Sequence, residues 1–210
     1  MHLSDVLAVP GYVRAARYKA FLGDRSFEQE YLALYELEVE DLDALQAVSD
    51  EHMRRIEADE MRRSPPETID RDNVRSMYFA ETGPRLGGHD DVPETLFMPF
   101  TEPVSEDDDE EFNRWYQEIH LPEVLDVPGF SAASRYKETG MNMTGRPWPI
   151  NFPYLALYEL GDGTKEAFEN AMKELRRRIS EGDRMEISDA LGSDKITQVY
   201  SRITDRISAI

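Results

Sequence analysis

Apolar and polar residues alternate in some segments of the chain and recur at a spacing of three to four residues in others. Alternation predicts strands, because neighbouring side chains of a strand point to opposite faces, whereas the longer spacing predicts helices with one apolar face. In the second half of the chain, the expected strands cover 94–104, 129–138, 154–160 and 195–204, and the expected helices cover 105–119 and 164–182. The predicted order of elements is therefore β-α-β-β-α-β.

The first half of the chain repeats much of this pattern. Residues 2–19 (HLSDVLAVPGYVRAARYK) align with 120–137 (HLPEVLDVPGFSAASRYK) at an offset of 120 − 2 = 118. The heptapeptide YLALYEL at 31–37 recurs unchanged at 154–160. Self-similarity of this extent predicts two copies of one structural unit. The first copy lacks the opening strand and most of the first helix. The two repeats are expected over 1–88 and 89–210.

The predicted order of elements is that of a ferredoxin-like unit, in which four antiparallel strands carry both helices on one face. The other face of the sheet is also partly apolar, because YLALYEL has apolar residues at both alternating sets of positions. A second sheet is expected to cover that face. The fold class we expect is α+β, with two ferredoxin-like repeats, the first truncated at its start, packing sheet to sheet.

The segment FNRWYQEIHLPEVLDVPGF (112–130), followed by strands that contain SRY and YLALYEL, resembles the EthD-like branch of the dimeric α/β-barrel superfamily. The resemblance covers 94–204 in full and 2–82 in part. It implies two units that close face to face into an eight-stranded barrel, with a small-molecule cavity between sheet and helix. Members include cofactor-free monooxygenases, cyclases, lyases, isomerases and haem enzymes, so the resemblance indicates fold more sharply than reaction. Because the first copy is incomplete, we also expect a homodimer.

Charge and composition narrow the classes of function. The chain has 24 Lys and Arg against 43 Asp and Glu, a net charge of −19, so its field repels nucleic-acid phosphates and anionic lipids. No apolar run is long enough to cross a membrane, and the absence of cysteine excludes thiolate chemistry and Cys-ligated metals. We expect a cytoplasmic protein that binds neither nucleic acid nor membrane.

His120 and Tyr116 are the candidate catalytic residues. They lie four residues apart and share a face of the predicted helix, and Pro122 is expected to end that helix close to His120. An imidazole at such a position can move a proton near neutral pH, and a tyrosine hydroxyl can orient a carbonyl or enolate oxygen. A purely structural His120, bonded to a backbone carbonyl, is the alternative. The resemblance implies that this histidine faces the pocket; His2 is its equivalent in the first copy.

Aromatic residues and one arginine form the candidate substrate-binding set. Neighbouring residues of a strand face opposite sides, so the pair Arg135-Tyr136 places one side chain on each face of the sheet. An arginine there either clamps a carboxylate or pairs with the abundant acidic residues. The helix aromatics are equally compatible with a core role, and the loop 138–153 is a candidate lid or a dimer contact. The expected substrate-binding residues are Phe112, Trp115, Arg135, Tyr136, Trp148 and Tyr158.

No metal site is expected. The acidic run 105–111 lacks the spacing of a calcium loop and is explained by the preference of helix starts for negative charge. His52 and His89 stand alone, without a metal-binding motif. Glycine-rich nucleotide-binding motifs are absent as well, so we expect no cofactor, with haem as the alternative that the resemblance raises.

Two hypotheses about function follow. The first is a cofactor-independent lyase, isomerase, cyclase or monooxygenase that acts on a small aromatic or polyketide-like compound, with His120 as general acid or base. The alternative is a binding or accessory protein that holds a hydrophobic ligand without chemistry. The superfamily's catalytic breadth favours the enzyme.

Overall fold

The computed structural model describes residues 3–23, 29–61, 69–88, 93–183 and 186–209. The strands are β1 (Tyr12–Gly23), β2 (Tyr31–Leu37), β3 (Phe79–Glu81), β4 (Leu86–Gly87), β5 (Thr95–Thr101), β6 (Phe130–Glu138), β7 (Tyr154–Leu160), β8 (Ile196–Arg202) and β9 (Ile207–Ser208). The helices are α1 (Leu3–Leu7), α2 (Leu42–Glu57), α3 (Asp109–Trp115), α4 (Leu121–Leu125) and α5 (Lys165–Glu181), with 3-10 turns at Arg71–Asn73 and Glu106–Asp108 and a π-helical turn at Tyr116–His120.

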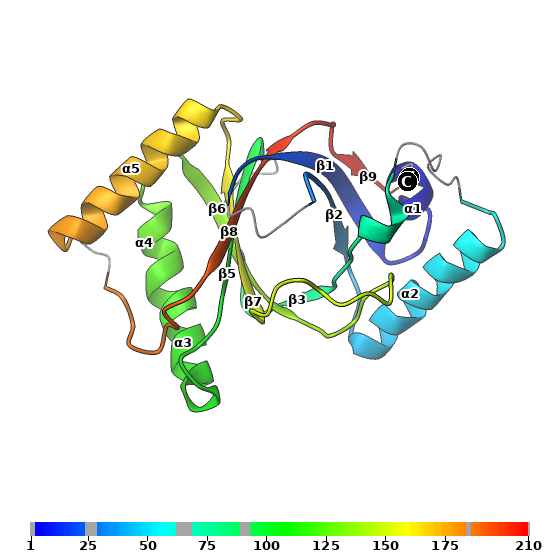
Figure 1. The fold of residues 1–210 in the computed structure, drawn as a ribbon, viewed down its shortest axis with the longest axis horizontal. Coiled ribbons are helices and arrows are strands. Elements are labelled where there is room, and N and C mark those ends of the chain that lie inside the picture. Colours follow the sequence, from blue (N-terminus) through cyan, green and yellow to red (C-terminus); the bar gives the residue numbers. More distant parts are fainter. Residues whose placement is uncertain (1–2, 24–28, 62–68, 89–92, 184–185, 210) are drawn as a thin grey trace.

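All strands belong to one antiparallel sheet. Its order is β2-β1-β8-β5-β7-β6-β3, with β4 beside β6 and β9 beside β1. The sheet curls, and Figure 1 shows α3, α4 and α5 on one side of the molecule and α1 and α2 on the opposite side. The α+β fold class expected from the sequence is thereby confirmed.

The second half of the chain forms a complete ferredoxin-like unit. Its four long strands lie in the order β8-β5-β7-β6, so the first strand of the unit occupies a central place between the third and the fourth. The helices α3, α4 and α5 pack on one face of these strands, where Phe97, Phe112 and Phe168 belong to the same buried cluster. The order of elements is the one that the apolar pattern predicts.

The first half of the chain completes the curled sheet from both ends. β1 pairs with β8 and β3 pairs with β6, so strands of the first half lie along both edges of the four-stranded unit. In the second half, β5 lies between β7 and β8. None of the described residues forms the corresponding strand between β2 and β3. The sheet is therefore an open barrel with a gap between β2 and β3.

The two faces of the sheet have different surroundings. On β7, Tyr154 and Tyr158 belong to the cluster under the helices, whereas Leu155 and Leu157 belong to the cluster inside the barrel. Every residue of β7 is buried. The identical heptapeptide in β2 alternates between exposed and partly buried residues. The same apolar heptapeptide is therefore buried on both faces of the sheet in β7 but not in β2.

The helix before β6 differs from the expectation. Pro122 was expected to end the helix near His120, but the chain continues through the π-helical turn into α4, where Pro122 lies in the first turn. Pro122 has no N–H group, and it directly follows the π-helical turn, where Leu121 donates to the Tyr116 carbonyl and the regular hydrogen-bond pattern of the helix changes. The prediction that Pro122 ends the helix is therefore wrong.

The two copies of YLALYEL provide a test of this packing. Leu160 in β7 is 1% exposed, and the equivalent Leu37 in β2 is only partly buried. We expect Leu160→Ala to lower the free energy of unfolding by about 2–5 kcal/mol, the usual cost of deleting a buried leucine side chain, and Leu37→Ala to lower it clearly less. Urea denaturation of both variants measures the difference. Equal losses would contradict the assignment of β7 as the more deeply buried copy.

Candidate functional site

The π-helical turn brings three aromatic side chains together. The ring of His120 stacks on Trp115, with centroids 4.7 Å apart and an angle of 24° between the planes, and meets the edge of Tyr116 at 4.8 Å. Trp115 is anchored by a hydrogen bond of 2.9 Å from its Nε1 to the carbonyl oxygen of Glu186. π-Helical turns occur frequently at functional sites. Here the extra residue of the turn sets the position of the imidazole.

Arg135 extends from β6 into the layer between the sheet and α3, and only 1% of it is exposed. Its guanidinium lies 3.7 Å from the ring centroid of Tyr116 and within 5.0 Å of those of Phe112 and Tyr154. Its Nη2 donates to the Asn113 side-chain oxygen at 3.2 Å. No carboxylate of the described residues forms an ion pair with it, and its Nε and Nη1 have no hydrogen-bond partner among those residues. Arg135 is thus a buried cation with unused donors.

Burial shifts the acidity of the groups around this cation. Burial first, and the nearby charge of Arg135 second, lower the pKa of His120 to about 4, so the imidazole is neutral at pH 7. Burial also raises the pKa of Tyr116, and it raises that of Tyr158 well above its usual value. The hydroxyl of Tyr158 has no hydrogen-bond partner among the described residues. At neutral pH this site therefore holds a proton acceptor, a cation and a free hydroxyl donor.

We call Trp115, Tyr116, His120, Arg135 and Tyr158 the Arg135 cluster. All five residues were predicted as site residues, and Phe112 packs beside them with its ring 5.3 Å from that of Tyr116. The cluster holds the groups needed for acid–base chemistry on a ligand with a negatively charged oxygen. Their assignment to a functional site stays a prediction.

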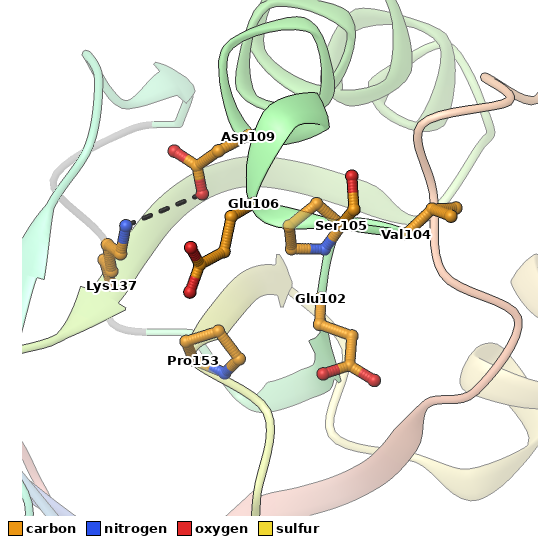
Figure 2. Close-up of a pocket in the computed structure, with 8 residues that line it drawn as sticks. Glu102, Val104, Ser105, Glu106, Asp109, Lys137 and Pro153 are labelled. Atoms are coloured by element: carbon orange, nitrogen blue, oxygen red, sulfur yellow. Dashed lines mark ion pairs between the residues drawn. The ribbon is translucent and has the colours of Figure 1, made fainter.

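A surface pocket of about 650 Å³ lies at the start of α3, and Figure 2 shows Asp109 and Lys137 on one side of it, paired at 3.6 Å. Hydrogen bonds connect this surface pocket to the Arg135 cluster. The hydroxyl of Tyr154 donates to an Asp109 oxygen at 2.6 Å, and Asn113 donates to that hydroxyl at 2.9 Å while accepting from Arg135. The buried cation is thereby linked to the surface through three side chains.

Two predicted site residues lie on the opposite face of the sheet. Tyr136 and Trp148 pack in the cluster inside the barrel. The ring centroid of Trp148 lies 6.0 Å from that of Phe79 and 6.3 Å from that of Phe100. The alternation that separates Arg135 from Tyr136 agrees with the prediction that these neighbours face opposite sides. The predicted site residues therefore divide between two places that the sheet separates.

A second buried network, which no sequence motif indicates, surrounds His52. His52 was expected to stand alone, but it is fully buried and its Nδ1 lies 3.1 Å from the hydroxyl of Tyr12, which in turn lies 3.1 Å from that of Tyr78. The spacing of Leu45, Ser49 and His52 along α2 is the signal that could have placed His52 on the buried face. The other two histidines mentioned above, His2 and His89, lie outside the described residues.

Asn113 and Tyr154 were also missed as members of the polar network, since an asparagine and a strand tyrosine have no distinctive spacing. In the part of the chain that the structure describes, no group of three or more His, Cys, Asp and Glu side chains is arranged to hold a metal. Within the same residues, no helix combines the length and apolar character that a membrane span requires.

Neither a protein-family model nor a curated protein matches the chain. Among solved structures, an anthrone oxidase-like protein aligns over 99% of this chain and 83% of its own, with 13% identity and a TM-score of 0.49. A protein of Lactobacillus acidophilus NCFM, provisionally assigned as a monooxygenase, aligns over 96% of this chain and 83% of its own, with 14% identity and a TM-score of 0.42. A major regulator of staphylococcal pathogenesis aligns over 92% and 99%, with 8% identity and a TM-score of 0.45. These likenesses concern overall shape, and function is argued from the chain's own residues.

The depressed pKa of His120 predicts how stability depends on pH. Between pH 6.5 and about 4, the unfolded chain binds a proton at this residue and the folded chain does not, so the free energy of unfolding falls as the pH falls. The contribution of His120 is about 3.5 kcal/mol at most, at roughly 1.4 kcal/mol for each pKa unit.

We therefore expect His120→Gln to lose less stability than the wild type between pH 7 and pH 4.5, as measured by urea denaturation at both values. His52, whose pKa burial also lowers, contributes equally to both proteins and serves as an internal control. The same pH dependence in both proteins would show that His120 is protonated in the folded state.

Proposed function

We propose that the protein is a small-molecule enzyme whose site is the Arg135 cluster, and that it acts on an aromatic or polyketide-like compound with an anionic or ionisable oxygen. The observation that carries this proposal is the burial of Arg135 without a carboxylate partner, beside a neutral histidine. A binding or accessory protein that holds such a compound without chemistry is the alternative function.

The unused donors of Arg135 favour an anionic ligand. A buried charge without a partner costs several kcal/mol, and a guanidinium stays charged because its pKa is too high for deprotonation in a protein. An oxyanion can accept from Nε or from Nη1. Arginine binds carboxylates through two parallel N–H groups when one of these donors acts together with Nη2, which here donates to Asn113. The surrounding rings of Phe112, Tyr116 and Tyr154 favour an aromatic body for the same ligand.

The chemistry proposed for the site is proton abstraction. Neutral His120 accepts a proton from an acidic C–H or O–H group of the bound compound, and the negative charge that develops on the ligand oxygen is stabilised by Arg135 and by the hydroxyl of Tyr158. The imidazolium that forms then returns the proton at another position. A lyase, isomerase or cyclase needs only these proton movements, whereas a monooxygenase also needs dioxygen as a second substrate.

The surface pocket beside Asp109 and Lys137 is the proposed entrance. Its carboxylate is part of the hydrogen-bonded path that ends at Arg135, so a ligand that disturbs the Asp109–Lys137 pair also disturbs the position of Asn113. Loss of the Asn113 contact would free a third donor of Arg135 for the ligand. Entry and anion binding are coupled in this arrangement.

The proposed reaction uses no cofactor. The close packing of the His120 imidazole, which stacks on Trp115 and meets Tyr116, supports a site without haem. The homodimer expected from the sequence stays a prediction, which analytical ultracentrifugation tests.

Arg135→Met tests the role of the buried cation. Because the variant removes an uncompensated charge from the interior, we expect its melting temperature to equal or exceed that of the wild type. We also expect it to lose binding of 1-hydroxy-2-naphthoate, an aromatic anion, which is measured by quenching of tryptophan fluorescence. The uncharged 2-naphthalenemethanol is the control ligand. A large loss of stability with unchanged naphthoate binding would show that Arg135 has a structural role only.

A second experiment tests proton abstraction without knowledge of the natural substrate. 2-Tetralone has an acidic C–H group beside its carbonyl, and its exchange with deuterium in D₂O is followed by NMR. We expect the wild type to accelerate this exchange by about 10²-fold or more over buffer, the usual range for general base catalysis.

His120→Gln and Arg135→Met are both expected to reduce the exchange to the rate in buffer. Tyr200→Phe, on the inner face of the sheet, is the control variant and should keep the wild-type rate. Binding of 2-tetralone by the wild type without any acceleration would contradict catalysis and favour the alternative of a binding protein.

A further inference from the structure

The interior of the open barrel contains a second cavity, which we call the barrel cavity. It has a volume of about 840 Å³ and is lined by both strands that border the gap, β2 and β3. Its inner wall is apolar, with Ala16, Leu34, Leu96, Leu155 and Leu157. A volume of this size is in the range of sites for small organic molecules. The sheet separates this cavity from the Arg135 cluster.

Aromatic side chains border the apolar wall. Tyr18 and Tyr136 face the cavity from β1 and β6, and Phe79 lies at the gap. Burial raises the pKa of Tyr18 and of Tyr136 to about 12, so both rings carry neutral hydroxyl groups at pH 7. Neutral aromatic rings attract organic cations through the negative potential of their faces.

A buried polar group lies on the same inner face. Ser134 is two residues before Tyr136 in β6, so both side chains point to the same side of the sheet. Only 1% of Ser134 is exposed, and a side-chain hydrogen bond from Ser134 acts on the pKa of Tyr136. Ser134 therefore belongs to the surroundings of the Tyr136 hydroxyl.

The charges that line the barrel cavity are predominantly negative. Six carboxylates stand against the guanidinium groups of Arg14, Arg85 and Arg206, which gives 3 − 6 = −3. Arg85 pairs with Glu159 at 2.7 Å, whereas Glu36 pairs with both Arg206, at 3.0 Å, and Arg14, at 3.4 Å. The excess of negative charge therefore comes from the carboxylates that form no ion pair among the described residues, which are those of Glu38, Glu40, Asp41 and Glu81. The six carboxylates belong to Glu36, Glu38, Glu40, Asp41, Glu81 and Glu159.

Glu36 and Glu159 occupy equivalent positions in the two copies of YLALYEL. Both act electrostatically on Tyr18 and on Tyr136, while Arg202 and Arg206 act on Tyr18 with the opposite sign. Aromatic faces in a cavity with an excess of carboxylates are a favourable environment for a positive charge with an apolar body.

We propose that the barrel cavity is a binding site for a small organic cation with an apolar, ring-containing body. The body lies against the leucines of the inner wall, and the charge lies at the tyrosine rings beside Glu36 and Glu159, where it competes with the arginines that pair with these carboxylates. This site is independent of the proposed function, since the Arg135 cluster selects ligands of the opposite charge on the other face of the sheet.

Two acridines of opposite charge test this proposal. Proflavine is a cation at pH 7 and acridine-9-carboxylate is an anion with the same three rings. Titration with the protein, followed by fluorescence anisotropy, is expected to show saturable binding of proflavine and none of the anion at the same concentrations. Equal binding of both acridines, or binding of neither, would overturn the proposal.

Four variants locate the binding. Glu36→Gln and Glu159→Gln should each weaken proflavine binding by about tenfold, because each removes a charge near the ring faces. Glu166→Gln is an equal change of charge at an exposed position of α5 and should leave proflavine binding unchanged. Ala16→Leu should abolish binding by filling the cavity, with circular dichroism as the control for folding.

Several results would overturn the assignment. Equal affinities of the Glu36, Glu159 and Glu166 variants would show binding to the general negative surface. Displacement of proflavine by an extended peptide of the β5 sequence (ETLFMPFTEPV) would show instead that the gap accepts a polypeptide strand. Arg135→Met should bind proflavine like the wild type, so failure of the proposed function does not affect this test.

Discussion

The pairing of β1 with β8 and of β3 with β6 is the constraint on which the rest of this structure depends. Because these pairs join the two halves of the chain edge to edge, all strands share one sheet with two distinct faces. Along β6, consecutive side chains must then enter different surroundings, Arg135 the helix layer and Tyr136 the barrel. The separation of the proposed anion site from the proposed cation site follows directly from this alternation.

The helix layer explains why the two halves are chemically unequal. Arg17 matches Arg135 in the repeated sequence, but it is only partly buried, because the first half has α1, the counterpart of α4, without a counterpart of α3 among the described residues. Solvent therefore reaches Arg17, whereas α3 and the π-helical turn seal Arg135. Burial, rather than the identity of the residue, therefore makes Arg135 chemically different from Arg17.

The sequence predicts the order of elements, the fold class and the residues of the Arg135 cluster, because helical spacing and strand alternation are local properties. The π-helical turn escapes prediction, since the four-residue spacing of Phe112, Tyr116 and His120 fits an α-helix as well as a π-helical turn. The hydrogen bond between His52 and Tyr12 joins residues 40 positions apart. The helical spacing around His52 predicts that its side chain is buried, but it does not predict the partner. The position of Trp148 could not be predicted either, because the residues of its loop do not alternate or recur in a way that assigns the side chain to one face of the sheet.

The identical heptapeptides of β2 and β7 have a consequence for folding. β1 and β6 are also similar in sequence. During folding, either of them can therefore pair with β2 or with β7, but only β1 with β2 and β6 with β7 are native pairs. The connections within the native pairs are much shorter than those between the halves, and the entropy of closing a loop rises with its length. Short connections therefore pair each copy with its own neighbour, and the additional pairing with β5, rather than the sequence of either heptapeptide, makes β7 the central copy.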